Sequence, residues 1–342
     1  MKKSVVLLLV AIVMLAGCQL GPVVPERPPE ARIAFMTDRD GNFEIYVMER
    51  DGSNPVNLTN SETNEGLPAW SSRLSSLAYI SQQQSGNLGL QRMDAGGNNV
   101  ITLSENDSLA PSPPAWSPTG QWLAFGQGDQ QTADVYLTDA AGEQLVNLTD
   151  SPAFDLFATW TPDGSHVLFL SDRDGNIAIY SMPVTGGEAT ALTDTSFGSG
   201  RPVFSPDGQH IAFMSNMDGD IELYSMDPDG GNIVRLTESP GFDGFPLWSP
   251  DGRKIMFLSG RDGNAEIYVM NADGSDPVNL TNTPDAQESV EGDFSWSPDG
   301  QQILFHSNAD GDVEVYVMNA DGSNVINLTD NSATDFGAVW IE

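Results

Sequence analysis

The sequence predicts an all-β fold, a seven-bladed β-propeller of four-stranded antiparallel blades, on three observations. An aromatic residue recurs at intervals of 44 to 48 residues along most of the chain. Each recurrence carries the same series of short apolar runs, and turn sequences separate those runs. No segment has a helical period. Repetition at this interval, with several strands in each unit, is typical of propeller blades.

Four apolar positions define the repeat. The first is an aromatic anchor, found at Trp70, Trp116, Trp160, Phe204, Trp248, Trp296 and Trp340. Nine residues later a second aromatic follows the first six anchors, at Tyr79, Phe125, Phe169, Phe213, Phe257 and Phe305, and Phe35 has this role in the opening unit. A tyrosine, once a leucine, lies eleven residues further on, and a leucine completes each unit.

Each position lies in a short β-type run, and we call the four runs of a unit strands A to D. Strand A carries the anchor and ends in a turn such as Ser249 to Gly252, in which proline and glycine favour a hairpin to strand B. Strand B resembles the run from Ile211 to Met214, and strand C the run from Glu266 to Met270. Strand D is the Asn-Leu-Thr run. Asp-Gly turns join B to C and C to D, so each unit predicts a four-stranded meander.

Residues 32–342 are expected to form the propeller. The first unit starts at strand B, near Arg32, and the last ends with a strand A around Ala338 to Ile341. We therefore expect the C-terminal strand to join the N-terminal three in one closure blade, which would leave the ring without open edges.

Residues 1–17 resemble a bacterial lipoprotein signal peptide. Lys2 and Lys3 precede a short apolar run, and Leu15 to Cys18 reads Leu-Ala-Gly-Cys. Residues 18–31 then provide a lipidated Cys18 and a Pro-rich tether, whose last 13 residues would reach roughly 40 Å if extended. Acylation of Cys18 predicts a lipid anchor on the extracytoplasmic side of the bacterial cell envelope. The alternative is an ordinary secretory peptide that contains a cysteine.

The repeat resembles the TolB-type, WD40-like propeller repeat. The likeness rests on Trp-Ser-Pro-Asp-Gly, Ile-Ala-Phe, Asp-Gly-Asn, Glu-Ile-Tyr-Val-Met and Asn-Leu-Thr, and it covers about 310 residues. It implies a propeller fold, while related blades occur in binding proteins, peptidases and polysaccharide lyases. The namesake of the family differs, since it is a soluble periplasmic protein with an α/β domain ahead of six blades. We therefore expect a TolB-like protein that is not TolB itself.

The charge balance narrows the class of partner. The chain has 48 acidic residues against 14 lysines and arginines, for a formal net charge of −34. This surface repels nucleic acid and anionic lipid, so membrane attachment is expected only through the N-terminal lipid. It favours cations, basic partners or simple solubility.

An acidic position precedes most anchors by five residues and is the main candidate site. It is occupied by Glu65, Asp155, Asp243, Glu291 and Asp335. The D-to-A loops of all blades meet at one mouth of the channel, so these residues predict a binding ring there. Aromatic residues flank two of its members, at Phe154, Phe157, Phe242 and Phe245. The alternative is ordinary turn chemistry.

Two of the B-to-C turns suggest calcium. The oxygen-bearing side chains alternate at Asp38, Asp40, Asn42, Asp172, Asp174 and Asn176. The glycine spacing differs from that of an EF-hand, and Asp-Gly hairpins explain the same residues. No other cofactor is expected.

We therefore expect a monomeric binding or scaffold propeller that recognises a protein or peptide at the channel mouth. Whether that partner is basic, and whether a cation assists its binding, are left open by the sequence. The alternative is a polysaccharide-acting enzyme of the lyase-like type. No catalytic residue is predicted, because His166, His210 and His306 have no partners at ligand spacing and no Gly-x-Ser-x-Gly motif is present.

Overall fold

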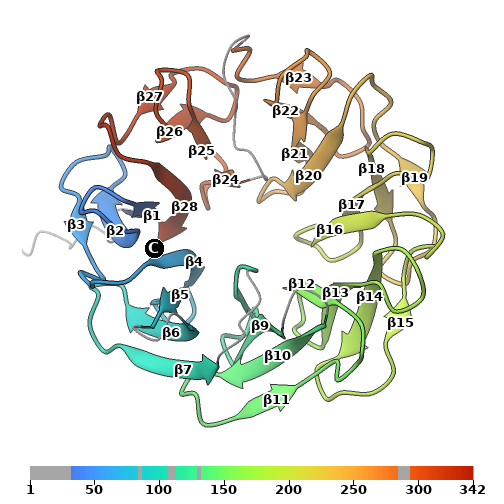
Figure 1. The fold of residues 1–342 in the computed structure, drawn as a ribbon. Coiled ribbons are helices and arrows are strands. Elements are labelled where there is room, and N and C mark those ends of the chain that lie inside the picture. Colours follow the sequence, from blue (N-terminus) through green and yellow to red (C-terminus); the bar gives the residue numbers. More distant parts are fainter. Residues whose placement is uncertain (1–31, 84–86, 107–111, 129–131, 284–292, 342) are drawn as a thin grey trace, which may run out of the picture. The chain divides into compact units, whose positions relative to one another are not determined.

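The computed structural model describes residues 32–83, 87–106, 112–128, 132–283 and 293–341. They form seven four-stranded antiparallel sheets, arranged as blades around a central opening (Figure 1). Within these ranges no helix has the length and apolar character needed to cross a bilayer. The predicted seven-bladed propeller is confirmed. The leader, Cys18 and the tether lie outside the described residues.

We number the blades along the chain. Blade 1 contains β4 (Glu65–Ser71), β5 (Ser76–Gln82), β6 (Leu88–Asp94) and β7 (Ile101–Asn106). Blade 2 contains β8 (Ala115–Trp116), β9 (Trp122–Gly128), β10 (Ala133–Asp139) and β11 (Leu145–Asn147). Blade 3 contains β12 (Asp155–Trp160), β13 (His166–Ser171), β14 (Ala178–Pro183) and β15 (Thr190–Ala191). Blade 4 contains β16 (Ser199–Phe204), β17 (Ile211–Ser215), β18 (Glu222–Met226) and β19 (Val234–Arg235).

The last three blades follow the same order. Blade 5 contains β20 (Asp243–Trp248), β21 (Lys254–Ser259), β22 (Glu266–Asn271) and β23 (Val278–Asn279). Blade 6 contains β24 (Ser295–Trp296), β25 (Gln302–Ser307), β26 (Glu314–Asn319) and β27 (Ile326–Asn327). Blade 7 contains β28 (Asp335–Ile341), β1 (Arg32–Thr37), β2 (Glu44–Glu49) and β3 (Val56–Asn57). In every blade strand A lies nearest the central opening (Figure 1).

Blade 7 joins the two ends of the propeller, as predicted. β28 pairs antiparallel with β1, and Trp340 lies opposite Ile33. The Trp340 side chain is buried in a cluster with Phe35 and Tyr46 of blade 7 and with Leu304 of blade 6. The C-terminal strand therefore completes one blade and packs it against its neighbour.

The aromatic positions of the repeat form the core of each blade. Phe169 and Tyr180 are cross-strand partners with ring centroids 5.9 Å apart, and both are buried. Between blades, the indole nitrogen of Trp160 donates a hydrogen bond to the carbonyl of Ala115 in blade 2, at 2.9 Å. Trp116 and Trp248 make the equivalent bond to the carbonyls of Ala69 and Val203, at 3.1 and 3.2 Å, so in three blades the anchor ties the innermost strand to the preceding blade.

Most outer strands are shorter than the predicted Asn-Leu-Thr run. β3 ends at Asn57, because the side-chain oxygen of Asn57 accepts hydrogen bonds from the backbone nitrogens of Thr59 and Asn60, at 3.0 and 2.8 Å. This side-chain turn replaces further strand pairing.

A β-bulge in strand A positions the channel side chains. The registers of β4, β12, β16 and β20 with their partners each skip two residues. The first skipped residue has a left-handed backbone: φ is 53° at Leu67, 55° at Phe157, 51° at Arg201 and 57° at Phe245. We call this the bulge position. Such bulges redirect a side chain from its expected face.

Candidate functional site

A cavity of about 250 Å³ is lined by the innermost strands of blades 2 to 5 and by Phe294 of blade 6. We call it the channel pocket. The rings of Phe157, Phe245 and Phe294 and several prolines form its wall. Arg201 is the one charged residue among the described residues that line it. The pocket is therefore apolar and aromatic, with a single basic group.

Arg201 lies between two aromatic rings. Its guanidinium carbon is 5.0 Å from the centroid of Phe157 and 4.8 Å from that of Phe245. The three residues occupy the bulge positions of β12, β16 and β20, so consecutive blades contribute equivalent side chains. Cation–π attraction on both sides holds the guanidinium in place. We call this arrangement the arginine clamp.

The backbone of the clamp is strained. Left-handed φ angles cost a residue with a side chain about 1 kcal/mol or more, and glycine avoids this cost. In β28 the same position is Gly337, with φ of 62°. The fold therefore accepts glycine at the bulge position, yet blade 1 carries a leucine and blades 3, 4 and 5 carry two phenylalanines and an arginine that line the pocket. Strain of this kind gathers at functional sites.

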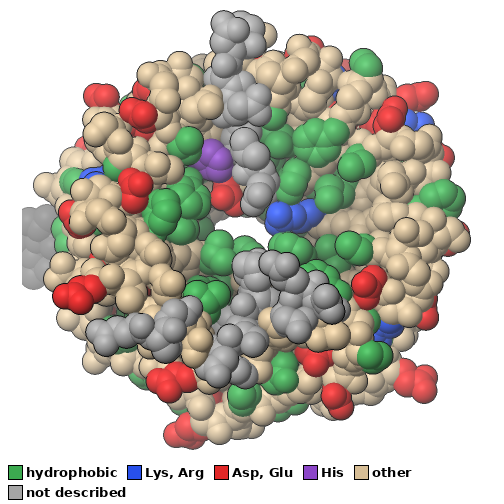
Figure 2. All heavy atoms as spheres, viewed as in Figure 1, with side chains coloured by type: hydrophobic (Ala, Val, Ile, Leu, Met, Phe, Trp, Pro, Cys, Tyr) green, Lys and Arg blue, Asp and Glu red, His purple; other side chains and the backbone are tan. Residues whose placement is uncertain are grey.

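The surface around the central opening agrees with this picture. Figure 2 shows a basic side chain at the edge of the opening, with hydrophobic side chains close to it, while acidic side chains are mostly scattered towards the periphery. Phe242 extends the aromatic surface, because its ring packs edge-on against Phe245 at 5.9 Å. Phe154 is half-buried and packs against the cluster of Ala133 and Leu156. Of the four phenylalanines singled out by the sequence, Phe157 and Phe245 line the pocket and Phe242 packs against Phe245.

The acidic ring lies deeper than its sequence suggests. Asp155, Asp243 and Asp335 begin their strands and have 0% exposed side chains. Each forms an ion pair with an arginine from the B-to-C turn of its own blade, and the pairs are Asp155–Arg173 at 2.9 Å, Asp243–Arg261 at 2.8 Å and Asp335–Arg39 at 3.2 Å. Glu291 lies outside the described residues. The three described aspartates therefore stabilise the junction between strand A and a turn.

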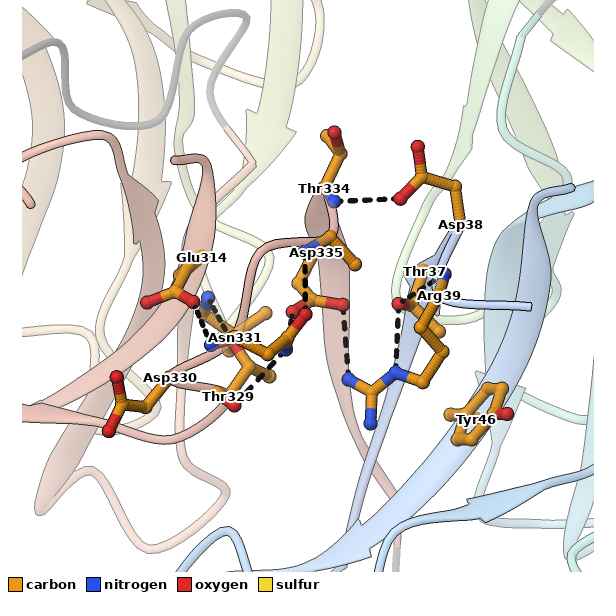
Figure 3. Close-up of polar contacts among 12 residues, drawn as sticks. Thr37, Asp38, Arg39, Tyr46, Glu314, Thr329, Asp330, Asn331, Thr334 and Asp335 are labelled. Atoms are coloured by element: carbon orange, nitrogen blue, oxygen red, sulfur yellow. Dashed lines mark hydrogen bonds and ion pairs between the residues drawn. The ribbon is translucent and has the colours of Figure 1, made fainter. Parts of the chain in front are cut away.

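Figure 3 shows this junction in blade 7. The side chain of Asp335, on β28, and that of Arg39, on the β1–β2 turn, point toward each other. The guanidinium of Arg39 also lies over the rings of Phe35 and Tyr46, at 5.3 and 4.8 Å. Asn331 donates a second hydrogen bond to Asp335, at 2.6 Å. The carboxylate of Asp335 thus has both an ion-pair partner and a hydrogen-bond donor beside it.

Blade 4 replaces both members of the ion pair. Ser199 occupies the acidic position, and its hydroxyl bonds to that of Ser215 at 3.1 Å. Met217 occupies the arginine position and packs in the cluster of Phe213 and Tyr224. The two exchanges occur together, so no buried aspartate is left without its cation in this blade.

Glu65 is buried without such an arginine. Among the described residues it has no ion pair and accepts hydrogen bonds from Ser61, Thr63 and Ser81, at 2.8 to 3.2 Å. Burial raises the pKa of Glu65 to about 7, and the neighbouring carboxylate of Glu44 adds to the rise.

The aspartates of the two predicted calcium turns accept hydrogen bonds within the protein, and the asparagines donate them. Asp38 accepts from the backbone of Thr334 and Asp172 from that of Phe154, at 2.8 and 2.9 Å. Asp40 and Asp174 accept from the hydroxyls of Tyr46 and Tyr180. The amides of Asn42 and Asn176 donate to the carbonyls of Thr63 and Thr195. In the described part of the chain, no group of three or more His, Cys, Asp or Glu side chains is placed to hold a metal.

Sequence reasoning missed Arg201 and the arginines of the B-to-C turns. A signal for the turn arginines is present, since Arg39, Arg173 and Arg261 occur in the blades whose strand A starts with aspartate. Arg201 has a weaker signal. Arg201 lies three residues before its anchor. The residue type at this place in the repeat varies more between blades than the residue types at the core positions do.

A family model described as the TolB beta propeller domain matches residues 29–199 and 193–293. The Tol-Pal system protein TolB of Desulfosudis oleivorans is 35% identical over 127 residues, which is 36% of this chain and 27% of that protein. A TolB homolog of Chlorobaculum tepidum is 35% identical over 112 residues, 32% of this chain and 25% of that protein. The chain thus spans about a quarter of the length of the curated relatives it matches.

Solved structures share the fold. TolB from Acinetobacter baumannii has a TM-score of 0.58 at 20% identity, over 87% of this chain and 79% of that one. Oligogalacturonate lyase from Vibrio parahaemolyticus has a TM-score of 0.67 at 17% identity, over 83% and 85% of the two chains. At these identities the likeness is one of fold.

Proposed function

The chain belongs to the TolB beta propeller family, and from this we propose that it is a binding protein of the bacterial cell envelope that captures a protein or peptide segment at the channel pocket. The observation that carries the proposal is the arginine clamp. Two phenylalanines and an arginine occupy strained bulge positions of three consecutive blades and line one cavity. Strained backbone positions of this kind cluster at ligand-binding sites.

The pocket suits a short peptide segment. Its volume of about 250 Å³ accommodates one or two side chains, while whole small molecules usually take larger cavities. Aromatic rings supply much of the binding energy in peptide and protein interfaces. The half-buried rings of Phe157 and Phe245 are therefore the expected contact points.

Selection from a random peptide display library tests this function. We expect enriched peptides to bind the wild type at least tenfold more tightly than the double variant Phe157→Gly with Phe245→Gly, since each lost aromatic contact is worth about 1 kcal/mol or more. Glycine keeps the bulge, as Gly337 does in β28. Leu67→Gly is the matched control, because Leu67 holds the same position in β4 outside the pocket lining. Enriched peptides that bind all variants equally, or a selection that enriches none, would contradict the function.

We further propose attachment through Cys18, with the protein on the extracytoplasmic side of the envelope. The Leu-Ala-Gly-Cys run supports this. Cys18→Ser should move the protein from the membrane fraction to the soluble fraction, and a variant that still sediments with membranes would contradict the lipid anchor.

A basic partner and calcium, both suggested by the acidic sequence, are separate proposals. Because the three described aspartates of the ring already pair with arginines, such ligands would bind other acidic surface of this strongly negative chain. Calorimetric titration with calcium and with oligolysine tests them. We propose no catalysis, and incubation with polygalacturonate tests this, since lyase action would yield unsaturated uronates.

A further inference from the structure

We propose that the junction between blades 1 and 2 holds a second binding site, on the face that carries the A-to-B and C-to-D turns, where Arg73 and Arg92 receive a small organic anion. This site is separate from the channel pocket and does not depend on the proposed function.

Neighbouring blades enclose a cavity on this face at two other places. A cavity of about 750 Å³ lies between blades 5 and 6, and one of about 380 Å³ lies between blades 4 and 5. Both are lined by the A-to-B turn of the first blade, by a cross-strand pair of its strands C and D, and by the anchor and the C-to-D turn of the second blade. Cavities of this size suit small organic ligands. We call the equivalent positions between blades 1 and 2 the basic seam, formed by Arg73, Arg92, Ile101, Trp116, Thr119 and Ala141.

Arg92 occupies a lining position of strand C. It pairs with Ile101 of β7 just as Val269 pairs with Val278 beside the larger cavity. Its cross-strand partners Ala78 and Ile101 belong to the apolar cluster that includes Trp116 of blade 2, so Arg92 lies on the face of its sheet that is turned toward blade 2. The other six blades have an uncharged residue at this position, namely Val47, Leu137, Ser181, Ser225, Val269 and Val317.

Arg73 reverses the charge of the A-to-B turn. The third residue after the anchor is an aspartate in blades 3 to 6, and two of these aspartates, Asp207 and Asp251, line the two cavities beside their own blades. In blade 1 the same place is Arg73, whose stem lies against the next turn. A β-carbon at Gly120 of blade 2 would lie only 3.2 Å from the β-carbon of Arg73 and 3.3 Å from its γ-carbon. Arg73 therefore lies at the junction with blade 2.

Blade 2 also lacks the carboxylates that the equivalent turns of blade 6 provide. Asp299 and Asp321, 3 and 25 residues after their anchor, line the larger cavity. Thr119 and Ala141 hold these places in blade 2. Between blades 1 and 2, neutral residues or an arginine thus replace three aspartates, and a second arginine replaces a valine. These exchanges lie far apart in the sequence and meet at one junction.

Four carboxylates remain near the basic seam, on Asp94, Glu105, Asp139 and Glu143. Asp94 and Asp139 accept hydrogen bonds from backbone nitrogens of their own C-to-D turns, at 2.9 to 3.2 Å. Glu143 is exposed on the C-to-D turn of blade 2, and Glu105 is exposed further along β7. In the part of the chain that the structure describes, neither seam arginine forms an ion pair with any of them. At physiological salt, more distant charges are largely screened, so an arriving anion responds mainly to this local set.

Arg92 carries a buried donor without an acceptor. Its side chain is half-buried, and its Nε atom is buried with no hydrogen-bond partner among the described residues. Six other arginines of the propeller pair with carboxylates, and they are Arg39, Arg50, Arg173, Arg235, Arg253 and Arg261. An unsatisfied buried donor is costly, and a carboxylate matches the guanidinium with two parallel hydrogen bonds. A bound anion would therefore supply the acceptor that the protein does not.

The apolar residues of the seam favour an organic anion over an inorganic one. Ile101 and Trp116 are half-buried and belong to one apolar cluster. A ligand with a hydrocarbon body can cover them while its carboxylates reach the arginines. An aromatic dicarboxylate has both features, and we take isophthalate as the probe.

Calorimetric titration at physiological salt tests the site with three probes. We expect isophthalate to bind at least tenfold more tightly than its neutral analogue isophthalamide and than inorganic phosphate. Arg92→Val and Arg73→Asp should each weaken isophthalate binding tenfold or more. Each variant installs the residue that other blades carry at the same position, so the fold should be kept. Arg253→Asp makes the same charge change on the exposed surface of blade 5 and should leave the affinity unchanged.

Equal binding of isophthalate and isophthalamide, or an affinity that survives in both arginine variants, would overturn the inference. Absence of isophthalate binding would overturn it too, and binding of the acidic peptide Ac-Asp-Ile-Asp-NH2 in its place would assign the seam to acidic peptides instead. Tighter binding of phosphate would rule out an organic ligand. The channel pocket is judged separately, because the Phe157→Gly and Phe245→Gly variant should bind isophthalate as the wild type does.

Discussion

Glu65 and Asp335 occupy the same position of their blades but have different surroundings. Asp335 has Arg39 as its cation, whereas the B-to-C turn of blade 1 supplies no arginine and Glu65 lies near the carboxylate of Glu44. Burial takes a carboxyl group out of water, and when no cation is nearby this favours the neutral form. The pKa of Glu65 therefore rises to about 7. At the residue scale, the same backbone position thus has a cation beside it in one blade and lacks one in another.

This difference predicts a pH-dependent effect of Glu65→Gln. Because the folded pKa of Glu65 lies above its unfolded value of 4.5, its contribution to stability is full below about pH 4.5 and is lost as the pH rises through 7. The variant should therefore resemble the wild type near pH 5 and exceed it by about 1 kcal/mol or more near pH 8. Melting temperatures at both pH values measure this.

Asp163→Asn is the control for that comparison. The pKa of Asp163 is lowered to about 2 by hydrogen bonds from Thr161 and Ser165, so its charge does not change between these pH values. A Glu65→Gln variant whose stability relative to wild type is the same at both pH values would contradict the raised pKa.

At the element scale, an arginine from the B-to-C turn ties that turn to strand A. Arg173 and Arg261 repeat the geometry of Arg39, each lying over the phenylalanine and tyrosine of strands B and C. In blade 4, Met217 covers the equivalent aromatic pair and Ser199 replaces the acid. The blade therefore tolerates either an ion pair or a neutral pair, but a mixed pair would bury a lone charge.

A double-mutant cycle in blade 7 tests this compatibility. Arg39→Met alone should destabilise the protein by about 3 kcal/mol, because it leaves the buried carboxylate of Asp335 without its cation. Adding Asp335→Ser reproduces the pair of blade 4 and should recover more than half of that loss, as measured by denaturant unfolding. Arg253→Met serves as control, since Arg253 is 85% exposed and its loss should be nearly neutral. A double variant destabilised by the sum of the single changes would refute the compatibility.

The sequence predicted the strands better than the site because core positions repeat and channel positions do not. Trp160, Phe169 and Tyr180 recur at fixed spacing since each must fill an equivalent space between neighbouring strands and blades. Arg201 projects from a bulge, and the place of a bulge depends on backbone registers that spacing does not reveal. The burial of Asp155 was likewise missed, because its arginine lies 18 residues away, in a turn that only the fold brings near.

At the scale of the whole molecule, β28 closes the ring of blades. It contributes Trp340 to the core of blade 7 and pairs with β1 along its length. Without it, the edge of β1 would be open and the cluster around Phe35 would lose a large side chain.

Deleting residues 335–342 should therefore destabilise the propeller strongly. Loss of the buried Trp340 alone costs about 3–5 kcal/mol, which corresponds to a fall in melting temperature of roughly 6 °C or more for a domain of this size. Thermal unfolding followed by circular dichroism measures the change. A truncated protein that melts within a degree or two of the full chain would rule out the closure role of β28.

The most direct test of binding at the channel pocket is nuclear magnetic resonance of the arginine side chains during titration with a library-selected peptide. The side-chain signal of Arg201, assigned by its loss in Arg201→Lys, should shift with saturation. The signals of Arg50 and Arg253, which form ion pairs outside the channel pocket lining, should stay in place. A saturable shift of these outer arginines with an unmoved Arg201 signal would contradict the account.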